Sequence, residues 1–313
     1  MKLTKQKSTA AIVCWAPNSP AIMKKTIRPA SIRHALRSFV AISFLFASSN
    51  LCSAAGLLTD VPGLSAGAQT SLVAHYDGRS GVAITGSTVD SWTPVDGNGT
   101  ALPGMVVTNT GTGASSLLTY DGFGTISFGD GPGSTRRLNG ALANAASASV
   151  TVFWRGFYDP SAAFATSGTY AYNIGPNDIS HQRDDGGGGF RVEMYNGTTY
   201  AGDDIMSYDN IPTVWSTVLT ANSHTAFANG TNLNLTGTPT NSLAANANID
   251  IGAYSGSGYD FVGDMSDLII FESALSDADR GLVEAHLMNV PEPSTTVLVG
   301  LCLLSLITRR RRG

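Results

Sequence analysis

The hydrophobic positions between residues 56 and 290 occur in short runs that turn-forming residues interrupt. The run Val150–Tyr158 is rich in β-branched and aromatic residues, and Phe190–Tyr195 alternates between apolar and polar positions. Both patterns are typical of β-strands and neither has a helical period. Similar patterns predict further strands or strand fragments at residues 72–76, 91–92, 125–128, 214–219, 249–252 and 261–271. This succession favours an antiparallel β-sandwich.

Two local signals organise the last third of this region. Asn229-Gly230 separates the runs 224–228 and 231–235, which predicts a two-residue hairpin whose turn residues both take positive φ. Ser276 precedes two acidic residues in the next three positions. We therefore expect Ser276 to cap a short helix that continues to about Met288, because acids in the first turn suit the helix dipole.

Charge divides the chain into three parts. Eight basic residues precede the apolar run 39–47, and four more, Arg309 to Arg312, lie at the C-terminal end. The stretch from Gly56 to Val290 holds 22 acidic residues, seven arginines and no lysine, which gives a net charge of −15. A polyanionic domain repels nucleic acid and acidic lipid, so we exclude both as its partners.

The N-terminal part has the organisation of a secretory signal peptide. Its apolar run is too short to span a bilayer as a helix. Ser53 and Ala55 fit the −3 and −1 positions of a signal peptidase site, which predicts cleavage between Ala55 and Gly56 and a signal peptide over residues 1–55. Met23 is a second potential start, and residues 1–22 would then precede the true signal.

The C-terminal part combines three features. Pro291-Glu292-Pro293 keeps the chain extended, the apolar run 296–307 follows, and the arginines Arg309, Arg310, Arg311 and Arg312 hold the end in the cytoplasm. Over residues 290–313 this tail resembles the PEP-CTERM signal that exosortases recognise. The resemblance implies transient membrane anchoring, cleavage near the Pro-Glu-Pro motif, and release or attachment at the cell envelope or extracellular matrix.

The middle part also resembles a known superfamily. The matching features are the Asn-Gly hairpin, the Ile-Gly strand near residue 250, the segment Phe261–Phe271 and the Ala-Leu-Ser-Asp-Ala-Asp-Arg helix start. Together they resemble the laminin-G-like domains of the concanavalin A-like lectin/glucanase superfamily. The resemblance implies an all-β jelly-roll sandwich of two antiparallel sheets over residues 56–289, with a short C-terminal helix, between a signal peptide and a C-terminal membrane segment.

Catalytic signals are weak in this domain. Glucanase relatives carry a Glu-x-Asp-x-x-Glu pair, because retaining hydrolysis needs an acid and a nucleophile about 5 Å apart. The sequence has no such motif, and Glu193, Glu272 and Glu284 are the only glutamates before the sorting motif. We expect Glu193 to be a lone strand acid and Glu284 to be solvated on the helix. We therefore expect no enzymatic activity.

Two acidic segments are candidates for a metal site. Asp184-Asp185 precedes four glycines, and Asp203-Asp204 lies close to Asp209. Carboxylate and carbonyl oxygens are the ligands that Ca²⁺ prefers, and laminin-G-like domains often carry a loop Ca²⁺. The alternative is that these segments are solvated loops without a metal.

The leading functional hypothesis is a noncatalytic surface or matrix adhesion module that recognises polysaccharide. It depends on the fold resemblance, the usual association of such sorting tails with exopolysaccharide, and the missing acid pair. Exposed aromatic rings stack on sugars, although tyrosine also packs ordinarily at sheet margins. The candidates, several of them in loop-like settings, are Tyr170, Tyr172, Tyr195, Tyr200, Tyr208, Tyr254 and Tyr259. The alternatives are a structural envelope component without a specific ligand and a divergent glycoside hydrolase.

Overall fold

The structure, a computed structural model, confirms an all-β fold with a short C-terminal helix. Every strand pairing that it describes is antiparallel. The strands belong to two sheets. The described residues are 56–86, 88–110, 118–121, 124–128, 137–159, 169–175, 179–184, 191–195, 200–204, 208, 211–234, 242–254 and 261–289.

One sheet, here called the helix-covered sheet, is built around the two longest strands. Hydrogen-bonded neighbours follow one another across it. Its strands, in spatial order, are β1 (Leu72–Asp77), β17 (Gly263–Phe271), β8 (Val150–Tyr158), β13 (Thr213–Leu219), β14 (His224–Ala228) and β15 (Thr231–Asn232).

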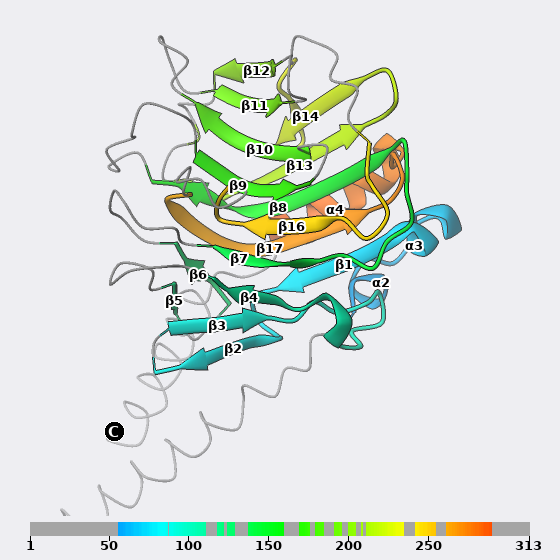
Figure 1. The fold of residues 1–313 in the computed structure, drawn as a ribbon. Helices are drawn as coiled ribbons and strands as arrows, with labels where there is room; N and C mark the ends of the chain where they lie inside the picture. Colours follow the sequence, from blue (N-terminus) through cyan, green and yellow to red (C-terminus); the bar gives the residue numbers. More distant parts are fainter. Residues whose placement is uncertain are drawn as a thin grey trace, which may run out of the picture. The chain divides into compact units, whose positions relative to one another are not determined.

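The other sheet, here called the front sheet, runs from β12 at the top of Figure 1 to β2 at the bottom. A 3-10 turn at Pro103–Met105 precedes β4, and β5 (Thr119–Tyr120) and β6 (Ile126–Ser127) connect β3 to β17 at one margin. The strands of the front sheet, in spatial order, are β12 (Tyr200–Asp204), β11 (Arg191–Tyr195), β10 (Ile179–Asp184), β9 (Thr169–Ile174), β16 (Asn248–Ile251), β7 (Leu138–Ala141), β4 (Val107–Asn109), β3 (Thr88–Trp92) and β2 (Val82–Thr85).

The main hydrophobic core fills the space between the two sheets. Trp154 and Trp215, which face each other across β8 and β13, are buried and stacked with their ring centroids 5.7 Å apart. Both tryptophans therefore belong to the core. His181 of β10 packs against both rings at 5.1 Å. These aromatic contacts join the front sheet to the helix-covered sheet.

A second core lies on the other face of the helix-covered sheet. Apolar side chains of β8, β13 and β17 pack there against α2 (Leu57–Asp60), α3 (Ala66–Ser71) and α4 (Asp277–Asn289). Figure 1 shows α4 behind the sheets. Within the described residues, no helix has both the length and the apolar character needed to cross a membrane.

Two predictions for the last third of the domain, the Asn229-Gly230 hairpin and the Ser276 helix cap, are confirmed. Asn229 and Gly230 have φ of 48° and 78°, and Ala228 pairs with Thr231 across the turn, as a two-residue hairpin requires. The hydroxyl of Ser276 accepts a hydrogen bond of 3.1 Å from the backbone N–H of Asp279. Ser276 therefore caps α4, which begins at the next residue.

Glu284, however, does not have the solvated position expected for it. The residue is only 2% exposed, because its side chain points from α4 toward β13. Ser216 donates a hydrogen bond to the carboxylate, and Arg280 approaches the same oxygen at 2.6 Å. The Arg280 guanidinium also lies 3.5 Å from the centre of the Phe227 ring. The sequence shows that Glu284 is a polar residue of the helix. It does not show which strand the helix packs against.

Replacing Glu284 by alanine will lower the free energy of unfolding by about 3 kcal/mol, because the change leaves the buried charge of Arg280 with only its longer contact to the exposed Asp277. Glu272→Ala is the control, since Glu272 is half-buried and only accepts a bond from the backbone of Ala145. Urea denaturation measures both losses. Equal losses in the two variants would show that the buried ion pair does not stabilise the docking of α4.

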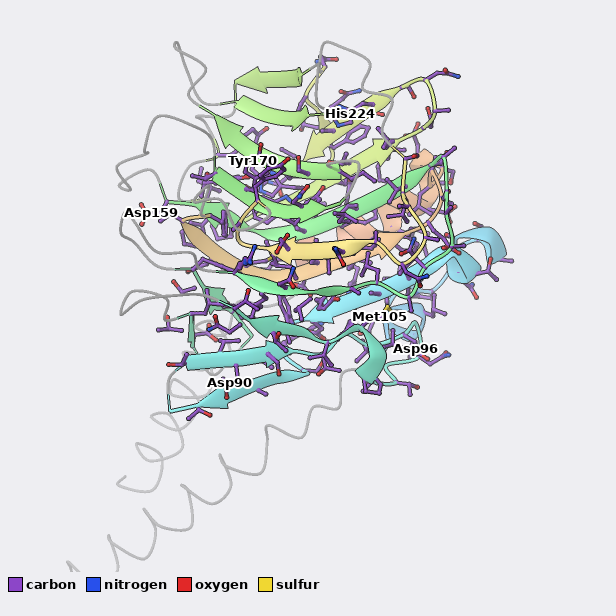
Figure 2. The ribbon with its side chains drawn as sticks, viewed as in Figure 1. Asp90, Asp96, Met105, Asp159, Tyr170 and His224 are labelled. Atoms are coloured by element: carbon purple, nitrogen blue, oxygen red, sulfur yellow. The ribbon has the colours of Figure 1, made fainter. Side chains whose placement is uncertain are left out.

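Two histidines are buried as neutral side chains between the sheets. Burial, together with the charge of the neighbouring His224, lowers the pKa of His181 to about 3. Burial lowers the pKa of His224, labelled on β14 in Figure 2, to about 4. The Tyr158 hydroxyl lies 2.8 Å from His181 Nδ1. The other nitrogen of His181 and both nitrogens of His224 have no hydrogen-bond partner among the residues that the structure describes.

These histidines will make the domain sensitive to acid. The unfolded chain takes up protons near pH 6.5 and the folded chain does not, so stability is lost as pH falls below that value. Each histidine will reduce the free energy of unfolding by about 1.4 kcal/mol per pH unit between pH 6 and 4.5. Denaturation at several pH values should show a shallower slope for His224→Leu than for the wild type. An unchanged slope would contradict the assignment. The pKa of His286 is also lowered by burial, so His286 contributes to the slope in both proteins. The contribution of His224 is therefore the difference in slope between the wild type and His224→Leu.

Candidate functional site

A row of polar residues crosses the front sheet, one residue on each of six neighbouring strands. Each member lies directly opposite the next in the strand register, and directly opposed residues share one face of a sheet. We call this row the polar ladder. Its members are Ser180 (β10), Asn173 (β9), Asp250 (β16), Asn139 (β7), Thr108 (β4) and Ser91 (β3).

The ladder faces away from the core. Its neighbours along the strands, such as Tyr172, Ile249 and Ile251, are buried in the core between the sheets. Because successive side chains of a strand point to opposite faces, the ladder residues lie on the outer face. Thr108 is exposed and Asn139 is half-buried, whereas Asn173 is only 3% exposed. Accessibility therefore decreases from β4 toward β10.

Asp250 is the charged centre of the ladder. Its carboxylate accepts a hydrogen bond of 2.8 Å from the Asn139 amide, and the Arg137 guanidinium lies 3.4 Å from the same oxygen. Arg137 also donates to the Thr110 hydroxyl at 3.0 Å. These contacts fix the carboxylate and amide on β16 and β7. The charge of Asp250 is partly compensated locally.

The β9–β10 end of the ladder has unused hydrogen-bonding capacity. The side-chain oxygens of Thr169, Asn173 and Ser180 are buried and have no hydrogen-bond partner within the described part of the chain. Thr169 lies on the same face as Asn173, four residues earlier in β9. Buried polar atoms without a partner are rare in proteins and mark places where water or a ligand supplies the missing bond. The ladder is therefore the candidate binding surface.

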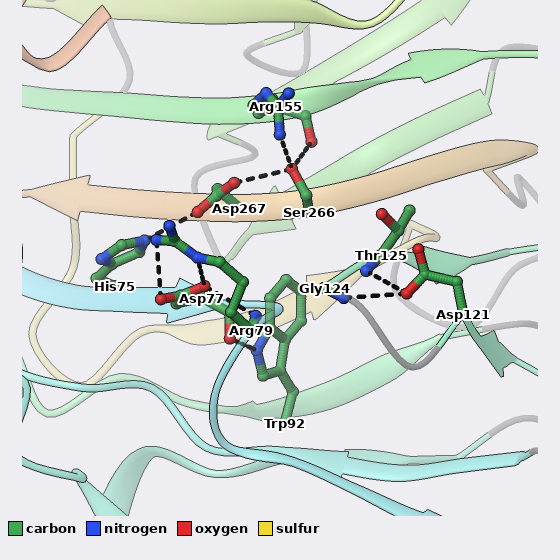
Figure 3. Close-up of polar contacts among 10 residues, drawn as sticks. All are labelled: His75, Asp77, Arg79, Trp92, Asp121, Gly124, Thr125, Arg155, Ser266 and Asp267. Atoms are coloured by element: carbon green, nitrogen blue, oxygen red, sulfur yellow. Dashed lines mark hydrogen bonds and ion pairs between the residues drawn. The ribbon is translucent and has the colours of Figure 1, made fainter. Parts of the chain in front are cut away.

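A second polar cluster lies on the face of the helix-covered sheet that points away from the main core. Figure 3 shows its contacts. Asp77 and Asp267 face each other across β1 and β17. Arg79 donates two side-chain bonds to Asp77, at 2.8 and 3.0 Å. His75 Nε2 lies 3.2 Å from Asp267, and the Ser266 hydroxyl donates to the other oxygen of Asp267 at 2.8 Å.

The contacts of this cluster hold the carboxylate of Asp267 in the ionised form. Burial opposes the ionisation of Asp267, but the His75 hydrogen bond and the charges of His75 and Arg79 outweigh it, so its pKa lies below the usual value. Asp77 is buried beneath its bidentate arginine. A general acid in glycoside hydrolysis needs a raised pKa. The sequence did not reveal this carboxylate pair, because residues 77 and 267 meet only through the β1–β17 register.

The predicted calcium residues are only partly described. Asp185 and Asp209 lie outside the described residues. Asp184 ends β10, and Asp203 and Asp204 belong to β12 rather than to a loop. The register places Arg191 of β11 between Asp184 and Asp204. Neither interpretation of these segments, as a calcium site or as solvated loops, included this arginine. Among the described residues, no three or more His, Cys, Asp or Glu side chains form a group able to hold a metal ion.

The predicted processing residues fall almost entirely outside the described part. This applies to Ser53 and Ala55 of the signal peptidase site, and to the sorting residues Pro291, Glu292, Pro293, Arg309, Arg310, Arg311 and Arg312. Gly56 is described: it is buried at the start of α2. A Cβ atom there would collide with the backbone of residues 97–99, so the first residue after the predicted cleavage site is closely packed in the fold.

Not all of the candidate tyrosines lie in loops. Tyr170 and Tyr172 belong to β9 and are buried in the sandwich. Tyr170, labelled in Figure 2, packs against half-buried Tyr254 with ring centroids 4.9 Å apart. Tyr208 packs against Trp215. Tyr259 lies outside the described residues, and the side chains of Tyr195 and Tyr200 are not described.

Comparisons with solved structures find similar β-proteins at very low sequence identity. The sialidase of Trypanosoma rangeli has a TM-score of 0.46 and 12% identity, over 80% of this chain and 38% of the sialidase. The botulinum neurotoxin serotype D ligand binding domain, solved in complex with N-acetylneuraminic acid, has a TM-score of 0.46 and 10% identity, over 72% of this chain and 52% of that chain. The matches span well under two thirds of either relative. TM-scores below 0.5 do not establish a shared fold or function.

No curated protein matches the sequence at a significant level. A family model for the PEP-CTERM protein-sorting motif matches residues 289–312, which confirms the resemblance seen in the tail. The chain therefore carries a PEP-CTERM sorting motif at its C-terminal end, the mark of an exported protein that is anchored transiently in the membrane before processing.

Proposed function

We propose that this chain is an exported, noncatalytic polysaccharide-binding module of the cell envelope or extracellular matrix, and that its ligand lies along the polar ladder. In this proposal, signal peptidase removes residues 1–55 and an exosortase processes the tail. The sandwich is a laminin-G-like jelly roll. The observation that carries the proposal is the ladder, with its buried and unpartnered oxygens on Asn173 and Ser180.

The spacing of the ladder suits a polymer of sugars. Neighbouring strands lie about 4.8 Å apart. The six polar side chains of the ladder are therefore separated by five such spacings, roughly 24 Å in total. One strand spacing is close to the advance of one sugar residue along an extended polysaccharide. Amide, hydroxyl and carboxylate groups bond sugar hydroxyls, and all three occur in the ladder.

The engaged state of three carboxylates, Asp250, Asp77 and Asp267, favours binding over hydrolysis at these positions. Asp250 is held by Asn139 and Arg137, and its ladder neighbours are amides rather than carboxylates. The only carboxylates that face each other in the described register, Asp77 and Asp267, are buried and paired with other side chains. Neither arrangement offers an acid together with a free nucleophile.

Replacing Asn173 by alanine will weaken retention on polysaccharide about tenfold, because a buried hydrogen bond to the ligand is lost. The full chain, purified in detergent, is incubated with a panel of insoluble neutral, anionic and amine-bearing polysaccharides, and the retained fraction is measured. Asn222→Ala is the control, since Asn222 is an exposed amide in the turn between β13 and β14 of the other sheet. Its retention should equal that of the wild type.

Three outcomes would overturn this proposal. Retention by no polymer in the panel would leave the ladder without a polysaccharide ligand. Equal retention of both variants, with unchanged melting temperatures, would move the site away from the ladder. Release of soluble sugars that stops in an Asp267→Asn or Glu193→Gln variant would favour a hydrolase instead.

Replacing Pro291-Glu292-Pro293 by three alanines will abolish processing of the tail. In a host with an exosortase, the mass of the exported wild-type product should correspond to a chain that ends near Pro293. The variant should keep residues 294–313 and stay in the membrane fraction. A wild-type product with its tail intact would indicate a permanently anchored protein and would remove the support for a matrix location.

A further inference from the structure

We propose that the polysaccharide bound by the ladder carries free amino groups, so that the ligand is a cationic polymer rather than a neutral or uronate-containing one. This inference rests on the proposed function, which names the surface and the class of ligand. Three independent features of the chain point to it: the net charge of the domain, the engagement of its arginines and the chemistry of the unpartnered atoms.

The first feature is the net charge. Residues 56–290 carry −15 without a single lysine. A field of this size raises the local concentration of cationic polymers and repels anionic ones over about a Debye length. Sulfated and uronate polysaccharides are therefore repelled before they reach the front sheet.

The second feature is that those arginines whose side chains are described are already engaged. The side chains of four arginines are described. Arg79 pairs with Asp77, Arg137 with Asp250, and Arg280 with Glu284 and Asp277. The fourth, Arg155, is buried and donates to Ser266. An anionic sugar near Asp250 would have to compete with Asp250 for Arg137, whose described side chain contacts the ladder.

The third feature is the kind of atom that lacks a partner. The unpartnered atom of Asn173 is its amide oxygen, which only accepts hydrogen bonds. It lies opposite Asp250, whose carboxylate also only accepts when ionised. An ammonium group brings three donors and a positive charge, and charge-assisted hydrogen bonds are the stronger kind. A carboxylate or sulfate brings no donor at all.

The test compares two polymers that share one backbone. Chitosan carries free amines, and chitin is the same polymer with its amines acetylated and therefore uncharged. Alginate serves as the uronate polymer. The full chain in detergent should be retained at least tenfold more strongly on chitosan than on chitin at a pH where the amines are protonated. It should not be retained on alginate.

Two variants separate the ladder from the general charge of the domain. Asp250→Asn and Asp277→Asn each remove one negative charge, but Asp277 is 92% exposed on α4, remote from the ladder. Asp250→Asn should lower retention on chitosan about tenfold, and Asp277→Asn should change it less than twofold. Equal effects would show attraction to the net charge alone and overturn the inference.

The remaining outcomes distinguish the two proposals. Retention on chitin equal to that on chitosan, or preferred retention on alginate, would overturn the inference and leave a polysaccharide-binding function standing. Retention on none of the polymers, including the wider panel, would overturn the proposed function itself. If Asp250→Asn melts at a lower temperature than the wild type, Asn173→Ala on chitosan provides the second ladder variant, with Asn222→Ala as its control.

Discussion

The structure depends on one constraint: the central strand pair β8–β17 must be buried on both of its faces. Trp154 and Leu268 face the core between the sheets, whereas Phe153 and Ile269 face the helices. A strand pair with two apolar faces is stable only when both are covered. The front sheet covers one face, and α2, α3 and α4 cover the other. The buried ion pair between the α4 residues Arg280 and Glu284 lies in this covered face, where the Ser216 hydroxyl of β13 donates to Glu284.

The same burial determines where the front sheet presents its polar groups. Ile249 and Ile251 are anchored in the core, so Asp250 must point outward. The neighbouring strands obey the same alternation around Tyr172 and Leu138. A slip of one residue in any pairing would turn a ladder residue into the core, where its polar atoms would be costly. The apolar core thus fixes the register, and the register produces a continuous row of hydrogen-bonding groups across six strands.

Local features of this fold could be predicted from the sequence, and long-range ones could not. The Asn229-Gly230 hairpin and the Ser276 cap depend on neighbouring residues and were predicted correctly. The alternation of Ile249, Asp250 and Ile251 also indicates an outward polar residue. Nothing in that alternation shows that Asn173 lies beside Asp250, because the two are separated by 77 positions and meet only through strand pairing. Glu284 was misplaced for the same reason: its partner Ser216 lies on a strand far away in the sequence.

The two polar clusters differ in how fully their hydrogen bonds are satisfied, and this difference bears on function. Asp77 and Asp267 hold partners on each oxygen, and such a network stabilises and specifies a fold without a ligand. Asn173 and Ser180 are buried without partners on the outer face of a sheet, which lowers stability unless another molecule completes the bonds. The unpartnered nitrogens of His181 and His224 are a separate case, because those rings are neutral and enclosed between the sheets. Asn173 and Ser180 combine missing partners with a position on the outer face of the front sheet, and there binding to an external ligand would compensate for the loss of stability.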